Sequence, residues 1–222
     1  MTAINAFLTP GGAHLLTDAA FYDTEGRLRH VASKIAVCEP LRMAIAVSGM
    51  AEAARVVDWY AAYQDLSQSY ALTLLPMVAR AIRDDNLRAG FPGEPDVQLV
   101  AALWSDEHDQ PQLWIASSNR AWFGERYQPG TLARVGAMSG GCIDPLSVVP
   151  PHRRADGFDA IRDGLALLRA QRAEPWPDNG RYYVGGFAER TTVTRGGIER
   201  MVLERWPDRL GELITPAENG QS

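Results

Sequence analysis

The chain has 222 residues, of which 46% are hydrophobic and 22% are charged, and its formal net charge at pH 7 is -5. This composition is typical of a folded globular protein, and the length suits one large domain or two small ones. The negative charge excludes a broad electrostatic attraction to nucleic acid or to an anionic membrane surface.

The N-terminal part of the chain predicts strands followed by helices. The predicted strands are 2–9, 13–22, 29–38 and 42–48. The turn Pro10-Gly11-Gly12 joins the first two strands as a hairpin, and Gly49 ends the run. Apolar residues then recur with the period of one helix face over 56–63 and again over 75–82. The second of these helices is expected to end before Gly90.

The second half of the chain returns to strands. They are predicted over 97–104, 112–117 and 131–138, and a strand-pair region that turns at Gly196-Gly197 is predicted over 182–194. A proline-rich loop or lid is expected over 144–152, a third helix over 158–168, and a frayed tail over 214–222. Because no long linker or repeat divides the chain, residues 1–222 are expected to form a single domain. This element order favours two stacked antiparallel sheets with helices outside them over a parallel βαβ fold.

The most informative residue is Lys34, the only lysine among 22 Lys and Arg residues. Arginine stays protonated, whereas the pKa of a lysine can be tuned by burial and by neighbouring charges. Asp18 lies midway between Thr2 and Lys34 in the sequence, so these three residues are candidates for one site. The alternatives are a solvated surface lysine, an aspartate in a turn or ion pair, and an ordinary second residue.

The spacing of these residues resembles that of a known family. The chain is similar to the proteasome-type N-terminal-nucleophile (Ntn) hydrolases, which include the proteasome β-subunits and a simpler bacterial proteolytic ring subunit. The residues that carry the resemblance are Thr2, the strand with Ala6-Phe7, the turn Gly11-Gly12, Asp18, Lys34, the segment AVSGMAEA (46–53), the turn Ser139-Gly140-Gly141, and Val184-Gly185-Gly186 followed by TTVTRGGI (191–198). The similarity runs through most of the chain and is sharpest over 2–54. It implies a four-layer αββα sandwich, with the site carried by the strands of residues 1–49.

The resemblance also implies a catalytic mechanism. Thr2 would be the nucleophile once Met1 is removed, and its free α-amine would take the hydroxyl proton. Lys34 would lower the pKa of that amine, which is about 7.7–8.0 in model peptides, and keep it neutral. Asp18 would pair with Lys34 and hold it in place.

Other parts of the site follow from the same similarity. Backbone N–H groups near Gly49 would stabilise the oxyanion, helped by the positive end of the next helix. Ser139, in a Ser-Gly turn before a helix, would be a further catalytic residue. The walls of the substrate pocket would be Phe21, Ala32, Ala36, Ala46 and Met50. All five are apolar, so cleavage after an apolar residue is expected. The alternative is that these alanines only pack the two sheets and that the substrate is a non-peptide amide.

Two departures from the family pattern favour a second interpretation. Arg181 and Val184 stand where the family's proteasomal members carry an Asp and a Ser that assist the nucleophile's amine, and retention of Met1 would block the site. The alternative function is therefore a catalytically inactive proteasome-like subunit that forms a ring or scaffold.

The remaining expectations concern partners and location. The resemblance implies a homo-oligomeric ring and leaves room for an ATP-dependent unfoldase. No cofactor or metal is expected, because the four histidines lack ligand spacing and there is no Gly-Lys-Ser/Thr phosphate loop. Neither a signal peptide nor an apolar run of membrane-spanning length is evident, and the two cysteines suggest no disulfide framework. A cytoplasmic location is therefore expected.

Overall fold

The computed structural model describes residues 3–49, 53–61, 66–90, 96–119, 127–141, 143–149 and 157–216. In chain order, its helices and strands are β1 (Ile4–Thr9), β2 (Gly12–Thr17), β3 (Ala20–Tyr22), β4 (Leu28–Val31), β5 (Ile35–Cys38), the 3-10 helix η1 (Glu39–Leu41), β6 (Met43–Gly49), α1 (Ala53–Ala61), α2 (Gln68–Arg88), β7 (Val97–Ser105), β8 (Gln110–Ser117), β9 (Leu132–Val135), β10 (Ala137–Gly140), α3 (Pro145–Val148), α4 (Arg162–Ala173), β11 (Phe187–Thr194) and β12 (Gly197–Arg205).

Two five-stranded sheets form the centre of the structure. The first sheet has the strand order β10-β1-β2-β11-β12, and the second has the order β5-β6-β7-β8-β9. β3 and β4 form a separate two-stranded ribbon. Every pair of neighbouring strands is antiparallel. In the β1–β2 hairpin, a Cβ on Gly12 would lie 2.7 Å from the carbonyl oxygen of Val193, so only glycine lets β11 approach this closely.

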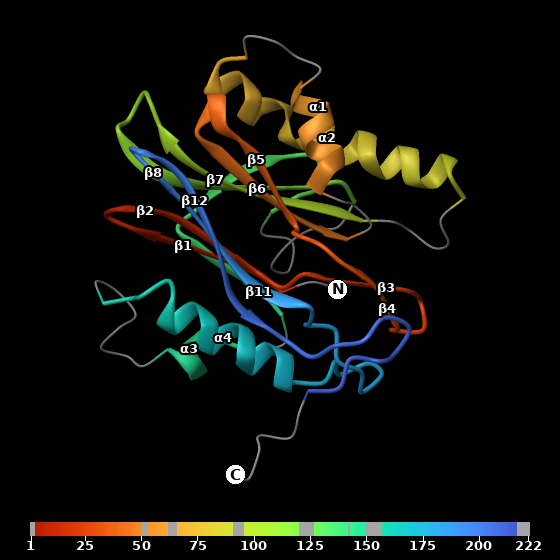
Figure 1. Ribbon diagram of the computed structural model, residues 1–222. Coiled ribbons are helices and arrows are strands. Elements are labelled where there is room, and N and C mark those ends of the chain that lie inside the picture. The colour runs from red at the N-terminus through yellow and green to blue at the C-terminus, as the bar shows by residue number, and fades with distance from the viewer. Residues whose placement is uncertain are drawn as a thin grey trace.

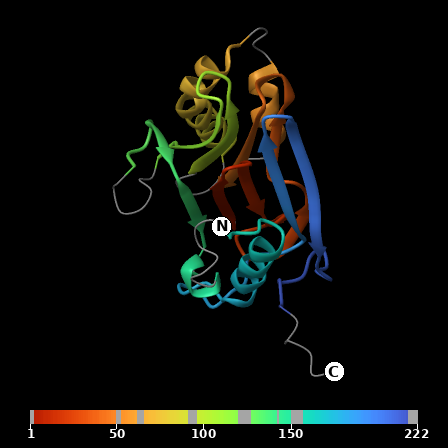
Figure 2. The ribbon, with the colours of Figure 1, turned by 90° about the vertical axis from the view of Figure 1, so that its left-hand side faces the viewer.

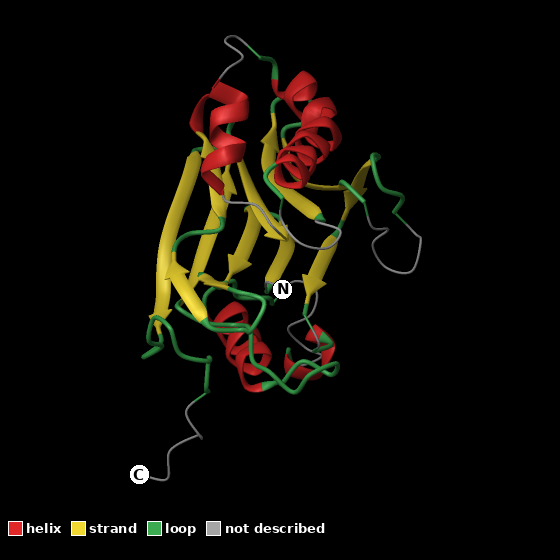
Figure 3. Ribbon diagram, turned by 90° about the vertical axis from the view of Figure 1, so that its right-hand side faces the viewer, coloured by secondary structure: helices red, strands yellow, loops and turns green. Residues whose placement is uncertain are grey.

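The core is divided by the alternation of side chains along the strands. On β6, Met43 and Ile45 pack under α1 and α2, whereas Ala44 and Ala46 pack against the first sheet. Leu168 of α4 packs on the other face of the first sheet. Helices α1 and α2 lie on one outer side of the molecule and α3 and α4 on the opposite side, with the strands between them (Figures 1 and 3). The expectation of antiparallel sheets with helices outside them is met at this level.

Two of the predicted N-terminal strands are broken where they reach the site. The predicted strand 13–22 stops at Thr17, because the carboxylate of Asp18 accepts a hydrogen bond from the N–H of Ala20 and turns the chain into the β3–β4 ribbon. The predicted strand 29–38 divides into β4 and β5, which lie in different sheets. Residues 32–34, including Lys34, form the connection. The predictions of two continuous strands were therefore wrong.

The predicted strand 131–138 is also two strands, and each belongs to a different sheet. β9 pairs with β8, and β10 pairs with β1, so the chain crosses from the second sheet to the first at Gly136. Figure 2 shows these two strands in green running from one sheet to the other. The crossing places Ser139 and Gly140 inside β10, opposite β1, rather than in the turn that the sequence predicts.

Three further predictions need correction. The segment 144–152 contains α3 as well as loop, and its last residues lie outside the described part of the chain. The strand predicted over 182–194 begins only at Phe187. The tail is not frayed at its start, because Ile214 is 3% exposed and forms a β-bridge with Tyr182. A single buried apolar residue anchors this tail, and such an anchor has no periodicity to reveal it in a sequence.

Candidate active site

Lys34 and Asp18 form a buried ion pair. The ammonium nitrogen of Lys34 lies 2.8 Å from Asp18 Oδ1, and the two residues are 2% and 0% exposed. The alternative of a solvated lysine at a strand edge is therefore wrong. Burying a charge is costly unless the charge is paired and hydrogen-bonded, and in this pair each charge is the partner of the other.

Asp18 is the centre of the site because both of its carboxylate oxygens accept hydrogen bonds. Oδ1 accepts from the ammonium and from the N–H of Ala3 at 3.1 Å. Oδ2 accepts from the N–H groups of Ala20 and Gly185 at 3.1 and 3.2 Å. The N–H of Asp18 in turn donates to the carbonyl of Ala3 at 3.4 Å. Because Ala3 follows Thr2 in the sequence, the ion pair is bonded directly to the residue after the predicted nucleophile.

Both sheets hold the loop 32–34 that carries the lysine. Ser33 Oγ donates to Glu189 of β11 at 2.6 Å, and the N–H of Val47 in β6 donates to the carbonyl of Lys34 at 2.9 Å. The ammonium therefore reaches Asp18 from a backbone that is fixed on two sides. This anchoring explains how a side chain with four flexible carbons is held in one position.

The surroundings of Lys34 lower its basicity. Burial lowers the pKa of Lys34 from its ordinary value, and the nearby Asp18 carboxylate opposes that shift. The ring of Phe21 adds a cation–π contact, with its centroid 5.3 Å from the ammonium nitrogen. Phe21 itself stacks on His30, with the ring centroids 4.2 Å apart. The ammonium group of Lys34 is thus held between the carboxylate of Asp18 and the ring of Phe21.

Two residues of the predicted site, Thr2 and Met50, lie outside the described residues. Gly49 is described, and it ends β6 with a φ of +89°. A Cβ on Gly49 would lie 1.8 Å from the carbonyl oxygen of Asp96. Glycine is therefore required there by the positive φ and by the close approach of the Asp96 backbone.

Ser139 belongs to a network of side-chain amides. Its Oγ donates to Asn5 Oδ1 at 2.6 Å and accepts from Gln171 Nε2 at 3.3 Å. Asn5 and Gln171 also exchange hydrogen bonds of 2.8 and 3.0 Å. The hydroxyl of Ser139 is therefore engaged with β1 and α4. The network joins β10, β1 and α4 beside Ala3, and neither Asn5 nor Gln171 was predicted as part of the site.

The structure separates two of the predicted pocket walls. Ala46 has no exposed surface and packs between the sheets, whereas Ala36 packs in the cluster under α1 and α2. They face opposite sides of the second sheet because Ala36 pairs with Ile45 and not with Ala46. Ala32, by contrast, lies in the loop beside Lys34 and is half-buried. The prediction of one pocket wall shared by Ala36 and Ala46 is corrected accordingly.

A second buried ion pair lies behind Asp18 and was missed by the sequence reasoning. Arg172 on α4 and Asp208 after β12 lie 2.7 Å apart, with side chains 7% and 4% exposed. They bind the segment 184–186, which supplies the Gly185 N–H to Asp18. Arg172 and Asp208 form no short sequence motif, so the sequence does not predict their contact. The pair Gly185-Gly186 is the one sequence feature that marks the segment they bind.

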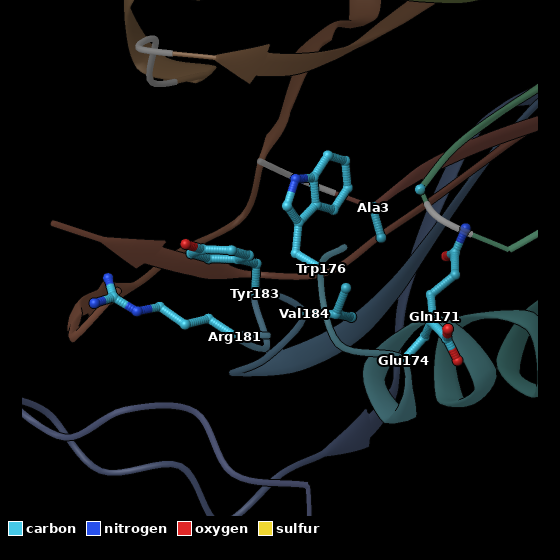
Figure 4. Close-up of a pocket in the computed structure, with 8 residues that line it drawn as sticks. Ala3, Gln171, Glu174, Trp176, Arg181, Tyr183 and Val184 are labelled. Carbon is cyan, nitrogen blue, oxygen red and sulfur yellow. The ribbon is translucent and has the colours of Figure 1, made fainter. Parts of the chain in front are cut away.

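A small pocket opens on the side of Ala3 that faces α4. Its lining residues are Ala3, Gly141, Gln171, Glu174, Trp176, Arg181, Tyr183 and Val184. Figure 4 shows Trp176 and Tyr183 near Ala3, and Gln171 and Glu174 extending from the end of α4. The cavity volume of ≈ 30 Å³ suits a water molecule or a small side chain rather than a whole ligand.

A larger pocket of ≈ 610 Å³ lies beside the start of α2, with Leu72, Trp114 and Arg134 among its lining residues. It contains none of the predicted site residues.

The residues at the two departures from the family pattern, Arg181 and Val184, make backbone hydrogen bonds. The carbonyl of Val184 accepts from Arg172, and the carbonyl of Arg181 accepts from the N–H of Trp176.

Comparisons with known proteins do not assign the chain to a family. No protein-family model matches it, and no curated protein matches it. Among the described residues, no helix is both long and apolar enough to cross a membrane. The same part of the chain contains no cluster of three or more His, Cys, Asp or Glu side chains arranged to hold a metal ion.

Proposed function

We propose that this protein is an N-terminal threonine hydrolase of the proteasome type, with a four-layer αββα sandwich, that cleaves peptide or other amide bonds. The observation that carries the proposal is the buried Lys34–Asp18 pair bonded to the N–H of Ala3. Lys34, the single lysine of the chain, is buried close to Ala3, the residue after Thr2. A charge in that position is suited to lower the pKa of the α-amine of Thr2.

The proposed reaction has two steps. The hydroxyl oxygen of Thr2 attacks the amide carbon while the free α-amine of Thr2 takes the hydroxyl proton and passes it to the departing amine. Water then hydrolyses the resulting ester and restores the hydroxyl. The charge of Lys34 favours the neutral form of the α-amine, and Asp18 holds that charge in place. Because Phe21 and Ala32 beside Lys34 are apolar, cleavage after an apolar residue is favoured.

The decisive experiment combines protein mass with active-site labelling. Intact mass spectrometry determines whether Met1 is absent, and an electrophile that cross-links an N-terminal threonine should label Thr2, as peptide mapping would show. Thr2→Ala should abolish both labelling and hydrolysis of fluorogenic peptides while the circular dichroism spectrum stays unchanged. Thr73→Ala, at an exposed position of α2, is the matched control and should retain full activity.

Other results would support the alternative of an inactive subunit. Retention of Met1 together with an unlabelled Thr2 would contradict the enzyme and favour a scaffold. Labelling of Thr2 without cleavage of any peptide would direct the search to non-peptide amides. Turnover that survives Thr2→Ala would contradict the proposed nucleophile.

The proposal includes assembly into a homo-oligomer, with a ring as the arrangement that the resemblance implies. Light scattering at micromolar concentration should give a mass that is a multiple of 24.4 kDa. A mass of 24.4 kDa across that concentration range would contradict the assembly, and it would leave the test of Thr2 unaffected.

A further inference from the structure

Arg172 and Asp208 form a two-pronged ion pair beneath the candidate site. Arg172 Nη2 donates to Asp208 Oδ1 at 2.7 Å, and Nη1 donates to Oδ2 at 3.0 Å. The guanidinium also lies over the ring of Trp206, 4.8 Å from its centroid. This planar fork fixes the direction as well as the distance of the pair, which a lysine could not do.

The pair binds the backbone of residues 184–186. Arg172 Nη1 donates to the carbonyl of Val184 at 2.8 Å, and Asp208 Oδ2 accepts from the N–H of Gly186 at 2.7 Å. The N–H of Trp206 donates to the carbonyl of Gly186 at 3.0 Å. Three hydrogen bonds from α4 and the segment after β12 therefore hold this short segment.

The residue between these two contacts binds Asp18. The N–H of Gly185 donates to Asp18 Oδ2 at 3.2 Å, and its carbonyl accepts from the N–H of Ala19 at 3.0 Å. A Cβ on Gly185 would lie 2.7 Å from Asp208 Oδ2. Gly185 is thus packed directly on Asp208 on one side and bonded to residues 18 and 19 on the other.

Stability alone does not account for such a pair. Replacing a buried ion pair by apolar residues of similar volume is often neutral or stabilising, because desolvation of the two charges offsets their attraction. Asp208 lies after β12, and Arg172, in the last turn of α4, reaches residues 184–186, which lie outside the helices and strands just before β11. Arg172 and Asp208 bind the backbone on either side of Gly185, and the N–H of Gly185 binds the carboxylate of Asp18.

We propose that Arg172 and Asp208 are positioning residues that fix the N–H of Gly185 on Asp18 and thereby hold the other carboxylate oxygen on Lys34 and Ala3. The structural part of this proposal is independent of the activity. Its catalytic consequence rests on the proposed function of the site. A loosened 184–186 segment would leave Asp18 with one donor fewer and a wider range of orientations.

The test removes both charges together, so that no unpaired charge stays buried. The variant is Arg172→Met/Asp208→Leu. The matched control is Arg169→Met/Glu204→Leu, which removes the fork that the same helix makes with β12 and whose hydrogen bonds do not go to residues 184–186. Both proteins are compared with the wild type by thermal unfolding, amide hydrogen exchange and NMR.

Two readouts report on the site without any substrate. The first is exchange of the Gly185 amide, which should become at least about tenfold faster in the variant while the amides of β11 keep their protection. The second uses the single lysine of the chain: protein labelled with ¹³Cε-lysine should give one lysine signal, from Lys34. The chemical shift and titration of that signal should change in the variant. The control should leave both readouts at their wild-type values.

Unchanged Gly185 exchange and an unchanged lysine signal in the folded variant would overturn the proposal. Equal changes in the control would also overturn it, because the effect would then be a general loosening of α4. Should the double variant fail to fold, Arg172→Lys serves in its place, since it keeps the charge and loses the planar fork. Because this substitution adds a second lysine to the chain, exchange of the Gly185 amide is its readout, and a smaller change in the same direction is expected.

Activity separates this proposal from the proposed function. If the protein hydrolyses amides, the variant should lose at least about tenfold in kcat with little change in KM, because a positioning residue acts on the reacting groups and not on substrate binding. If no activity is found while both spectroscopic readouts change, the positioning role stands and the proposed function falls. If activity is found and the readouts do not change, the positioning role falls alone.

Discussion

At the scale of single residues, the candidate site is built around two buried charges. Lys34 could equally have been exposed, as most lysines are. The structure instead places it at 2% exposure against Asp18, with backbone donors on the remaining carboxylate positions. Removing either partner would leave a charge in the core, which is the costly situation for a buried pair.

Substitution of Lys34 separates its charge from its shape. Lys34→Met should lower the free energy of unfolding by about 3 kcal/mol, because Asp18 loses its cation. The exposed pair Arg88–Asp85 supplies the control, since Arg88→Met should change stability by less than about 0.5 kcal/mol. Lys34→Arg should fold but lose at least about tenfold in turnover, or about 1.4 kcal/mol of barrier. Wild-type turnover in Lys34→Arg would show that only the charge matters.

His14 gives a prediction for the pH dependence of stability. Burial, with a smaller contribution from Arg190, lowers the pKa of His14 from 6.5 to about 4, and its ring nitrogens are hydrogen-bonded to Thr9 and Thr192. His14 therefore binds a proton more readily in the unfolded chain than in the folded one. The neutral, buried His14 contributes its full stability above pH 6.5, and this contribution is lost as the pH falls toward 4. Thermal unfolding at several pH values should show a smaller loss for His14→Gln than for the wild type over that range. Parallel curves for the two proteins would contradict the assignment.

At the scale of elements, the site forms where regular structure is interrupted. The breaks after β2, between β4 and β5, and before β11 bring Asp18, Lys34 and Gly185 together. The backbone N–H groups that bind Asp18 come from Ala3 just before β1, Ala20 at the start of β3 and Gly185 just before β11. Polar side chains and glycines at strand ends favour such breaks, but which ends meet is decided by the pairing of the sheets.

The close approach of the chain at the end of β6 can be tested through Gly49. Gly49→Ala should destabilise the protein by more than the about 1–3 kcal/mol of a strained backbone conformation, because its Cβ would also collide with the backbone of Asp96. Gly90→Ala is the control: Gly90 has a φ of +75°, and a Cβ there would meet no atom within 4 Å. Chemical denaturation measures both variants. Equal losses would contradict the close approach at Gly49.

At the scale of the whole molecule, the space between the two sheets is filled by alanines together with larger apolar side chains such as Ile4, Leu15 and Ile115. The inter-sheet cluster contains Ala6, Ala13, Ala44, Ala46 and Ala102. Small residues allow the sheets to approach closely, and close packing leaves little room for a larger group. The site lies at the margin of this interface, where Lys34 of the loop before β5 reaches Asp18 at the end of β2.

This packing predicts how Ala46 responds to enlargement. Ala46→Leu should lower stability by about 1–3 kcal/mol through overpacking between the sheets, as thermal unfolding would show. Ala137→Leu, at an exposed position of β10, is the control and should change stability by less than about 0.5 kcal/mol. A stable Ala46→Leu protein with altered substrate preference would restore Ala46 to the wall of the substrate pocket.

The sequence by itself determined the periodic elements and the candidate charges. Alternating and 3.6-residue patterns located most strands and the helices α1, α2 and α4, because periodicity records which face of an element is buried. The single lysine and its spacing from Asp18 singled out the pair before its contact was known. Tertiary structure alone decided that the pair is buried, that 13–22, 29–38 and 131–138 each divide in two, and that Arg172 and Asp208 stand behind Asp18. These features depend on contacts between residues far apart in the chain, and a local pattern carries no information about such contacts.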